Sequence, residues 1–382
     1  MRFDPKRALE EAGAFPENRL PWTDRGRMGI RLAAEAFARA GLQVECLEVN
    51  GFPSARNLQL AIGWLGFGFW LTLALLFKLH GGFGLPIRAV MLLLAPAWLL
   101  MSGSVVHWLA PRFGRAIRTK NVIAQRTSAP IAKLRVVFVT SLDASPPLPQ
   151  TSARKWSGWL FTLLVLIQFF ISLSRVTLPT AIKFALPATF QIVLVAWVVG
   201  RIRPFVGEGK TDNADGLGAL TELARTWPKS FDERLETRFA ALGGQALNLA
   251  GLRALGRQIR EDWPRKPTLV VGLWSPGVGQ RITLASPSLE ELAGEAAASL
   301  WIPTRRPRSV TIMNDLCPFG NDPPFIGLVG VAEPGEGPAF SLESLTRTAQ
   351  LATELALRWS RRETASSQEE GQTPARSSQN RG

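Results

Sequence analysis

The sequence predicts a mixed α/β domain, with a largely parallel sheet flanked by helices, that is interrupted by four transmembrane α-helices in two hairpins. Strand-like runs alternate with helical runs along the second half of the chain, which is typical of a parallel sheet covered on both faces. Four apolar stretches carry no charge over the length that a spanning helix needs, about 20 residues. The chain has 382 residues, so the remainder has room for one further domain rather than two.

The first part of the predicted domain covers residues 1–56. From Arg27 to Ala40 apolar residues recur at helical spacing, and Gly41 stands where a helix-ending glycine is expected. A strand is expected over Gln43–Val49. The first five residues lack the apolar core of a secretory signal.

Residues 57–111 and 156–200 are predicted to form the two transmembrane hairpins. The four expected spans are Asn57–Phe77, Ala89–Pro111, Ser157–Ser174 and Phe184–Gly200. The alternative is that these stretches are buried core helices, but each is longer than an ordinary core helix. A hairpin returns the chain to the side that it left, so the pieces of the α/β domain can assemble on one side of a bilayer.

Basic residues beside the expected spans predict the orientation of the chain in the bilayer. More of them flank the domain side than the opposite loops, which places the soluble domain and both termini in the cytoplasm. The formal net charge of +14 favours contact with the anionic head groups of a lipid bilayer over nucleic-acid binding, because no recognition motif for nucleic acid is present. The spans contain no buried acid or base, which argues against a transporter or channel.

The second part of the domain, residues 112–155, and its main part, residues 201–360, carry the other expected elements. Strands are expected over Asn121–Gln125, Leu134–Asp143, Leu235–Leu242, Leu269–Leu273, Arg281–Leu284, Ser309–Met313 and Phe325–Val331. Helices are expected over Leu217–Thr226, Leu247–Ile259, Leu289–Leu300 and Leu342–Trp359. Residues 361–382 are rich in Ser, Gln, Glu and Arg and are expected to be a disordered tail.

Two turns in the main part carry a resemblance to a known family. Asp212-Asn213-Ala214-Asp215-Gly216 precedes a helical run, and the next strand ends in Gly243-Gly244-Gln245-Ala246-Leu247. This order resembles the M28 family of zinc aminopeptidases. There an Asp-Asn-x-x-Gly turn opens a helix, and a Gly-x-Glu-Glu-Leu turn carries the general base and a metal ligand. Here the two glutamates are replaced by Gln245 and Ala246.

The resemblance covers roughly residues 27–56, 117–150 and 205–360, and it places the family's other metal motifs. The strand over residues 134–143 resembles the one that ends in His-x-Asp, with Ser141 at the histidine position and Asp143 retained. Trp274 falls on the ligand aspartate of a later strand. Asn314-Asp315-Leu316-Cys317-Pro318-Phe319 resembles a Ser-Asp-His-x-Pro-Phe turn, with Leu316 at the final histidine.

The resemblance therefore implies that the ancestral zinc site is lost and that no catalytic residue is intact. Of the five ligand positions only Asp212 keeps a side chain of the kind that binds zinc, which needs nitrogen, sulfur or carboxylate ligands. Gln245 cannot accept a proton as a general base does. The sequence has two histidines, His80 and His107, and both lie within or beside apolar segments. No metal or other cofactor is expected.

Two alternatives remain for the polar groups of this degenerate site. Asp143, Asp212 and Asp315 either hold a weak Mg²⁺ or Ca²⁺ ion, or act as a helix cap and turn formers, with Asp212 and Asn213 capping the helix near Ala214. Gln245 either lines a leftover pocket or forms local hydrogen bonds. Trp274 is expected to fill the former metal cavity.

The predicted function is that of a membrane-anchored, catalytically inactive M28-like protein acting as a binding or scaffolding module. Its expected partner is an unknown protein or a small ligand at the remnant pocket, in addition to the bilayer. The alternatives are an active membrane-bound zinc aminopeptidase with an altered site, and a small-molecule sensor that uses the same pocket.

Overall fold

The structure is a computed structural model. It describes residues 2–17, 19–52, 54–79, 85–113, 116–126, 132–143, 179–201, 213–228, 235–245, 249–286, 288–305, 323–331 and 340–372, with residues 163, 165–167, 169–171, 231 and 247. The chain forms two compact units. The α/β unit comprises Met1–Gly51, Arg118–Pro146 and Glu208–Gly382, and the helical unit comprises Phe52–Ile117 and Pro147–Gly207.

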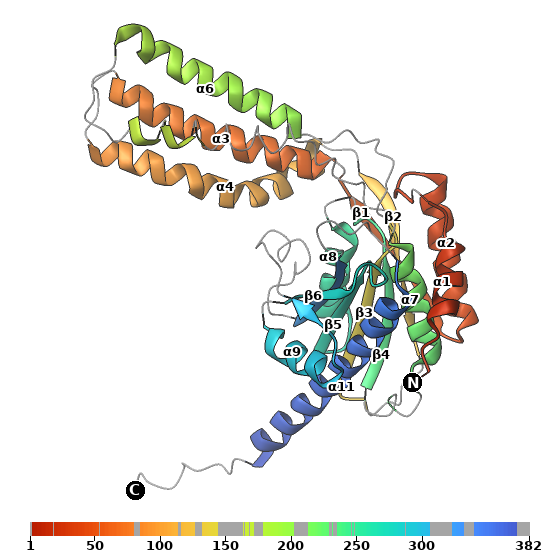
Figure 1. Cartoon of the computed structure of the whole chain (residues 1–382). Helices are drawn as coiled ribbons and strands as arrows, with labels where there is room; N and C mark the ends of the chain where they lie inside the picture. Colours follow the sequence, from red (N-terminus) through yellow and green to blue (C-terminus); the bar gives the residue numbers. More distant parts are fainter. Residues whose placement is uncertain are drawn as a thin grey trace, which may run out of the picture. The chain divides into compact units, whose positions relative to one another are not determined.

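The α/β unit is built on one sheet, which has eight strands in the part of the chain that the structure describes (Figure 1). The strands are β1 (Gln43–Gly51), β2 (Ile117–Gln125), β3 (Leu134–Ser141), β4 (Leu235–Leu242), β5 (Thr268–Trp274), β6 (Arg281–Ala285), β7 (Thr304–Arg305) and β8 (Phe325–Val331). Their order is β1-β2-β4-β3-β5-β8-β6-β7. The central strands β4, β3, β5 and β8 run parallel, and β2 and β6 flank them antiparallel. The mixed sheet of the prediction is thus confirmed.

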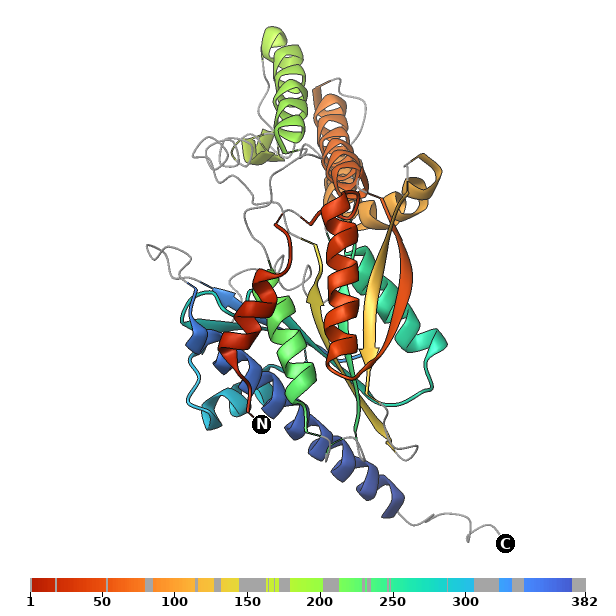
Figure 2. The same cartoon turned by 90° about the vertical axis from the view of Figure 1, so that its right-hand side faces the viewer.

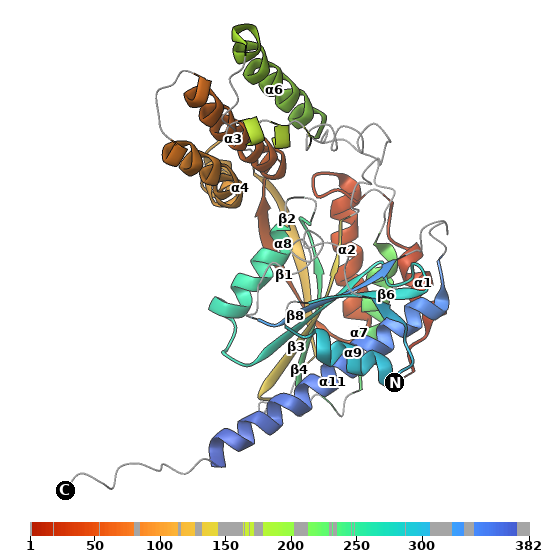
Figure 3. The ribbon, with the colours of Figure 1, turned by 60° about the vertical axis from the view of Figure 1, so that its left-hand side comes forward.

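Helices cover both faces of this sheet (Figures 1 and 3). One face carries α2 (Asp24–Arg39), α7 (Ala214–Thr226), α9 (Glu290–Ser299) and α11 (Leu342–Gln372), and the other carries α8 (Ala250–Arg257) with the π-helical turn η2 (Gln258–Asp262). Successive residues of β3 alternate between the faces, because side chains of a strand point to opposite sides. Val136 and Phe138 pack in the α7-side core, whereas Val137 and Val139 pack beneath α8.

The N-terminal helix α1 (Pro5–Gly13) packs against α7 (Figure 2). Its N-cap is Asp4, whose carboxylate accepts hydrogen bonds from the backbone N–H groups of Lys6 and Arg7, and Pro5 begins the helix. Gly218 allows the two helices to approach closely, since a Cβ at that position would lie 1.9 Å from the carbonyl oxygen of Ala8.

Two C-terminal features bear on the predicted boundaries. The strand expected over Ser309–Met313 lies outside the described residues. Helix α11 continues to Gln372, whereas the sequence predicts a disordered tail from residue 361. Its last turns contain Arg, Glu, Ala and Gln, which favour helix intrinsically. An ion pair between Arg358 and Glu354, one helical turn apart, adds local support.

The helical unit contains α3 (Ser54–Leu79), α4 (Leu85–Phe113) and α6 (Thr180–Arg201). Leu71 of α3 packs with Leu92 and Ala95 of α4, and Trp64 of α3 packs against Phe190 and Leu194 of α6. Polar contacts reinforce both pairs. The Trp98 indole donates to the Ile62 carbonyl at 2.9 Å, and the Gln191 amide donates to the Thr72 hydroxyl at 2.7 Å.

The predicted membrane spans are corrected by the structure. Among the described residues, no helix combines the length and the apolar character required to cross a bilayer. A spanning helix needs about 20 consecutive apolar residues. The prediction of four transmembrane helices is therefore wrong, and so is the multi-pass localisation with a cytoplasmic domain that depends on it.

Candidate functional site

The candidate site lies where the parallel strands β3, β4 and β5 end. Ser141 is the last residue of β3 and pairs in register with Leu242, the last residue of β4. The Leu142 N–H donates to the Leu242 carbonyl at 2.8 Å, which holds the two strand ends together. Trp274 ends β5 on the other side of β3. Ligands of open α/β sheets bind at the carboxyl ends of the strands, so the order of these strands brings Ser141, Gln245 and Trp274 to one edge.

Ser141 and Asp143 form a buried turn at the end of β3. Each residue is only 3% exposed. The Ser141 hydroxyl donates a hydrogen bond to the Asp143 backbone carbonyl at 3.0 Å. The Ser141 hydroxyl is therefore used to shape the chain.

Asn213 connects three segments at this edge. Its Nδ2 donates to the Thr140 hydroxyl of β3 at 2.7 Å, and its Oδ1 accepts from the Ser275 N–H after β5 at 2.7 Å. The Thr140 hydroxyl in turn donates to the Leu273 carbonyl at 2.6 Å. Asn213 precedes α7 but makes no side-chain cap hydrogen bond to it. Asn213 thus occupies the N-cap position that the capping alternative expects, but its side-chain amide bridges β3 and β5 and does not cap the helix.

Asp215 adds a second connection from α7 to the loop after β5. Its carboxylate accepts from the Gly277 N–H at 2.9 Å and from the Gly216 N–H at 2.9 Å. A carboxylate in the first turn of a helix is also stabilised by the helix dipole. The next residue must be small, because a Cβ at Gly216 would lie 2.5 Å from the Thr140 hydroxyl. The sequence motif contains Asp215, but only the fold gives it the role of holding the β5 loop.

At this edge, the side-chain amide of Gln245 has no hydrogen-bond partner among the residues that the structure describes. The turn that carries it is fixed by Asn121, whose Oδ1 accepts from the Gly243 N–H at 3.0 Å and whose Nδ2 donates to the Gly251 carbonyl at 2.8 Å. Gly244 takes a positive φ of 77°. Both Oε1 and Nε2 of Gln245 are buried, and neither has a hydrogen-bond partner among the described residues. Each such group costs about 1–3 kcal/mol.

Trp274 folds back onto the sheet. A Cβ at Gly272 would lie 1.6 Å from the Trp274 indole, and one at Gly327 would lie 3.3 Å from it, so the ring rests over these two glycines. The ring centroid is 5.7 Å from that of Phe325. Trp274 thus packs with the α8-side core.

Asp212, Ala246, Asp315 and Leu316 lie outside the described residues. Within the described ranges, no group of three or more His, Cys, Asp and Glu side chains is arranged to hold a metal ion. Two of the positions where the sequence resemblance places metal ligands have described side chains. Ser141 offers a hydroxyl that is already hydrogen-bonded, and Trp274 offers an indole packed on the sheet. These side chains do not fit a zinc ion.

Comparison with solved structures identifies the fold. The chain is similar to the LapA aminopeptidase of Legionella pneumophila, with a TM-score of 0.51 and 10% identity over 94% of this chain and 72% of that one. It is also similar to BSAP, a zinc aminopeptidase from Bacillus subtilis, with a TM-score of 0.50 and 13% identity over 93% and 95% of the two chains. A glutaminyl cyclase of Bacteroides thetaiotaomicron gives a TM-score of 0.50 and 12% identity over 93% and 98%.

These similarities establish an M28-like aminopeptidase and glutaminyl-cyclase fold, in agreement with the resemblance in the sequence. At such low identity they establish the fold alone. The scan against protein-family models and the search of curated proteins found no match to this chain.

Proposed function

We propose that the α/β unit is a non-catalytic binding module that uses its M28-like fold to hold a peptide end, or another small amide, at Gln245. The observation that carries this proposal is the buried and unpaired side-chain amide of Gln245. A primary amide presents one acceptor and two donors. A peptide group, or the amide of a small ligand, complements both kinds of atom at once. The similar folds include aminopeptidases, which is consistent with a ligand of this class.

The remaining polar groups of the site support the absence of catalysis. Ser141, Asn213 and Asp215 are occupied in hydrogen bonds that shape the strand ends. Glutamine lacks the carboxylate that a general base requires. Both histidines of the sequence, His80 and His107, fall in the helical unit, so the α/β unit has no imidazole to offer a metal. We propose that the ancestral zinc is lost and that binding remains.

The test is whether the protein binds an amino-acid amide without cleaving it. Wild-type protein is expected to bind leucinamide in isothermal titration calorimetry and to release no ammonia from it, with or without added zinc. Gln245→Met, which keeps the shape of the side chain but removes its amide, is expected to weaken binding about tenfold, because a hydrogen-bonded amide contributes about 1 kcal/mol or more.

The matched control is Gln258→Met, the same change at a buried glutamine in η2, which should leave binding unchanged. Gln245→Glu is expected to remain inactive, because it restores a base without a metal to activate water. Zinc-dependent cleavage of leucinamide by the wild type would contradict the proposal, and so would equal binding by wild type and Gln245→Met.

A further inference from the structure

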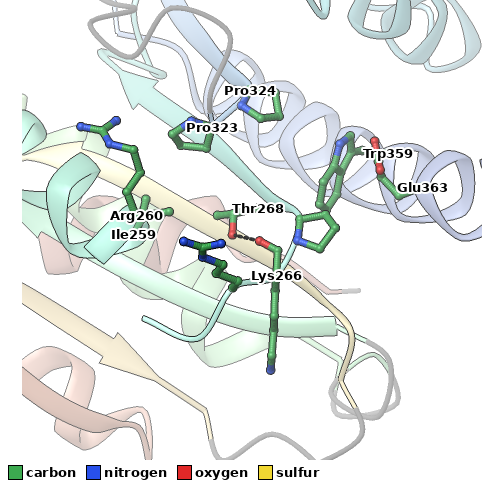
Figure 4. A pocket seen from close by; sticks show the side chains of 10 residues that line it. Ile259, Arg260, Lys266, Thr268, Pro323, Pro324, Trp359 and Glu363 are labelled. Atoms are coloured by element: carbon green, nitrogen blue, oxygen red, sulfur yellow. Dashed lines mark hydrogen bonds between the residues drawn. The ribbon is translucent and has the colours of Figure 1, made fainter. Parts of the chain in front are cut away.

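A hollow lies at the end of the sheet opposite to Gln245, where β5 and β8 begin. Figure 4 shows its walls: Thr268 at the start of β5, Pro323 and Pro324 before β8, and Trp359 and Glu363 on α11, with Arg260 on the other side. Its volume is about 660 Å³. Small-molecule sites typically enclose about 300–1,000 Å³, so the hollow is large enough for a small ligand.

Basic residues outnumber acidic residues in the walls of this hollow, which we call the basic hollow. Arg260, Arg265 and Lys266 contribute three positive charges, and Glu363 contributes one negative charge. The formal excess is therefore +2. Ile259, Pro267, Pro323 and Pro324 supply apolar wall between the charges. A ligand that suits these walls carries a compact double negative charge and an apolar body.

A buried ion cluster next to the hollow shares Lys266 with it and adds one further positive charge, from Arg135 and Arg238 against Glu236. The Glu236 carboxylate accepts hydrogen bonds from Arg135 at 2.8 Å, Arg238 at 2.8 Å and Lys266 at 2.7 Å. Three cations thus share one carboxylate. Arg135 is 1% exposed, and its Nη1 has no hydrogen-bond partner among the described residues.

The loop of residues 264–267 joins this cluster to the hollow. Arg135 Nη2 donates to the Pro264 carbonyl at 3.2 Å, and the Arg135 backbone N–H donates to the Pro267 carbonyl at 2.9 Å. The same loop contributes Arg265, Lys266 and Pro267 to the walls of the hollow. The excess of Arg135 and Arg238 over Glu236 therefore adds to the charge of the hollow, since buried charges are weakly screened.

We propose that the basic hollow binds a small organic phosphate, with the phosphate on the cationic loop and the organic part on the proline wall. A phosphate monoester carries about −1.5 to −2 charge at pH 7, which matches the formal excess. Guanidinium groups bind phosphate oxygens through paired hydrogen bonds. A ligand with a single carboxylate carries about half of this charge, so it would neutralise only part of the excess positive charge of the hollow. This site is separate from the one around Gln245.

The full-length protein can be titrated calorimetrically at low ionic strength with phenyl phosphate, inorganic phosphate and benzoate. Phenyl phosphate is expected to bind most tightly, because it alone supplies both the dianion and the apolar body. Arg265→Gln is expected to weaken its binding about tenfold, as the loss of a charged hydrogen bond does. Glu363→Gln removes the opposing carboxylate and is expected to tighten binding about threefold.

Arg31→Gln on α2 is the matched control, because it removes the same charge from an exposed position of the same unit. It should leave binding of phenyl phosphate unchanged. Equal weakening by Arg31→Gln and Arg265→Gln would show unspecific attraction and overturn the proposal, as would undetectable binding of phenyl phosphate. Misfolding cannot produce the tighter binding of phenyl phosphate that is expected for Glu363→Gln. If Glu363→Gln does not bind phenyl phosphate more tightly than wild type, that result also contradicts the proposed site. Leucinamide is not expected to compete with phenyl phosphate. Failure of this proposal can therefore be distinguished from failure of the proposal for Gln245.

Discussion

Replacing Glu236 with glutamine is expected to lower the free energy of unfolding by about 3–5 kcal/mol, the usual cost of removing one partner from a buried ion cluster. Arg135, Arg238 and Lys266 all donate to this carboxylate, and the guanidinium groups of Arg135 and Arg238 also lie over the Trp263 ring. The variant leaves three neighbouring cations without their anion. Urea unfolding at pH 7 measures the loss.

The effect is expected to depend on pH. Burial raises the pKa of the Glu236 carboxyl, but hydrogen bonds from Arg135 and Lys266 and the nearby positive charges outweigh it and lower the pKa to about 2. An unfolded glutamate has a pKa of about 4.3. Because the folded pKa is the lower one, the stabilisation is fully present above about pH 4.3 and is lost as the pH falls towards 2.

The control for this prediction is Glu343→Gln, which removes an exposed ion pair with Arg347 within α11. Its expected cost is below about 0.5 kcal/mol. A loss of less than about 1 kcal/mol for Glu236→Gln at pH 7 would contradict the role of the cluster. A difference from wild type that stays constant between pH 5 and pH 2 would contradict the depressed pKa.

Asn213→Ala is expected to lower the free energy of unfolding by about 2–4 kcal/mol. The change removes the hydrogen bonds to Thr140 and Ser275 and leaves the Ser275 N–H without its acceptor. An unsatisfied buried group costs about 1–3 kcal/mol, and a typical lost hydrogen bond about 1 kcal/mol. Ser275 has a φ of 46°, which is unfavourable for a serine and is held by this contact.

Hydrogen exchange provides a local measurement for the same variant. The amides of Ser275 and Gly277 are expected to exchange faster in Asn213→Ala, because the loop after β5 loses one of its two anchors and keeps only Asp215. Asn50→Ala is the matched control at an exposed position of β1, where a surface substitution changes stability by about 0.5 kcal/mol or less. If Asn213→Ala behaves like Asn50→Ala, Asn213 does not hold the strand ends together.

Local patterns were sufficient to predict seven of the eight described strands; the two-residue strand β7 was missed. The expected strands over Leu235–Leu242 and Phe325–Val331 coincide with β4 and β8, because apolar and β-branched residues with flanking turns mark buried strands. Helix α1 was missed although Asp4-Pro5 is a helix-start signal. Its face buries only the small residues Ala8 and Ala12, so its apolar pattern is weak.

Which side chains become neighbours depends on the order of the strands in the sheet, and the sequence alone does not show that order. From the sequence alone, Asn213 is expected to cap a helix. In the fold β3 and β5 are neighbours, and hydrogen-bond partners from both segments bind its amide. The charges around Glu236 come from positions 135, 236, 238 and 266, and only the pairing of β3 with β4 and β5 brings them together. The motif order placed Gln245 at a strand end, but its lack of partners required the fold. Apolar length alone did not distinguish a membrane span from another apolar helix.

Zinc content tests the proposed loss of the metal site most directly. The full-length protein, purified without chelators, is incubated with zinc, dialysed against metal-free buffer and analysed by inductively coupled plasma mass spectrometry. We expect far less than one zinc ion per chain, because Ser141 and Trp274 stand where the sequence resemblance places zinc ligands and the α/β unit contains no histidine. One or two zinc ions per chain, reduced by Asp143→Ala, would show that an intact metal centre remains and would contradict a non-catalytic role.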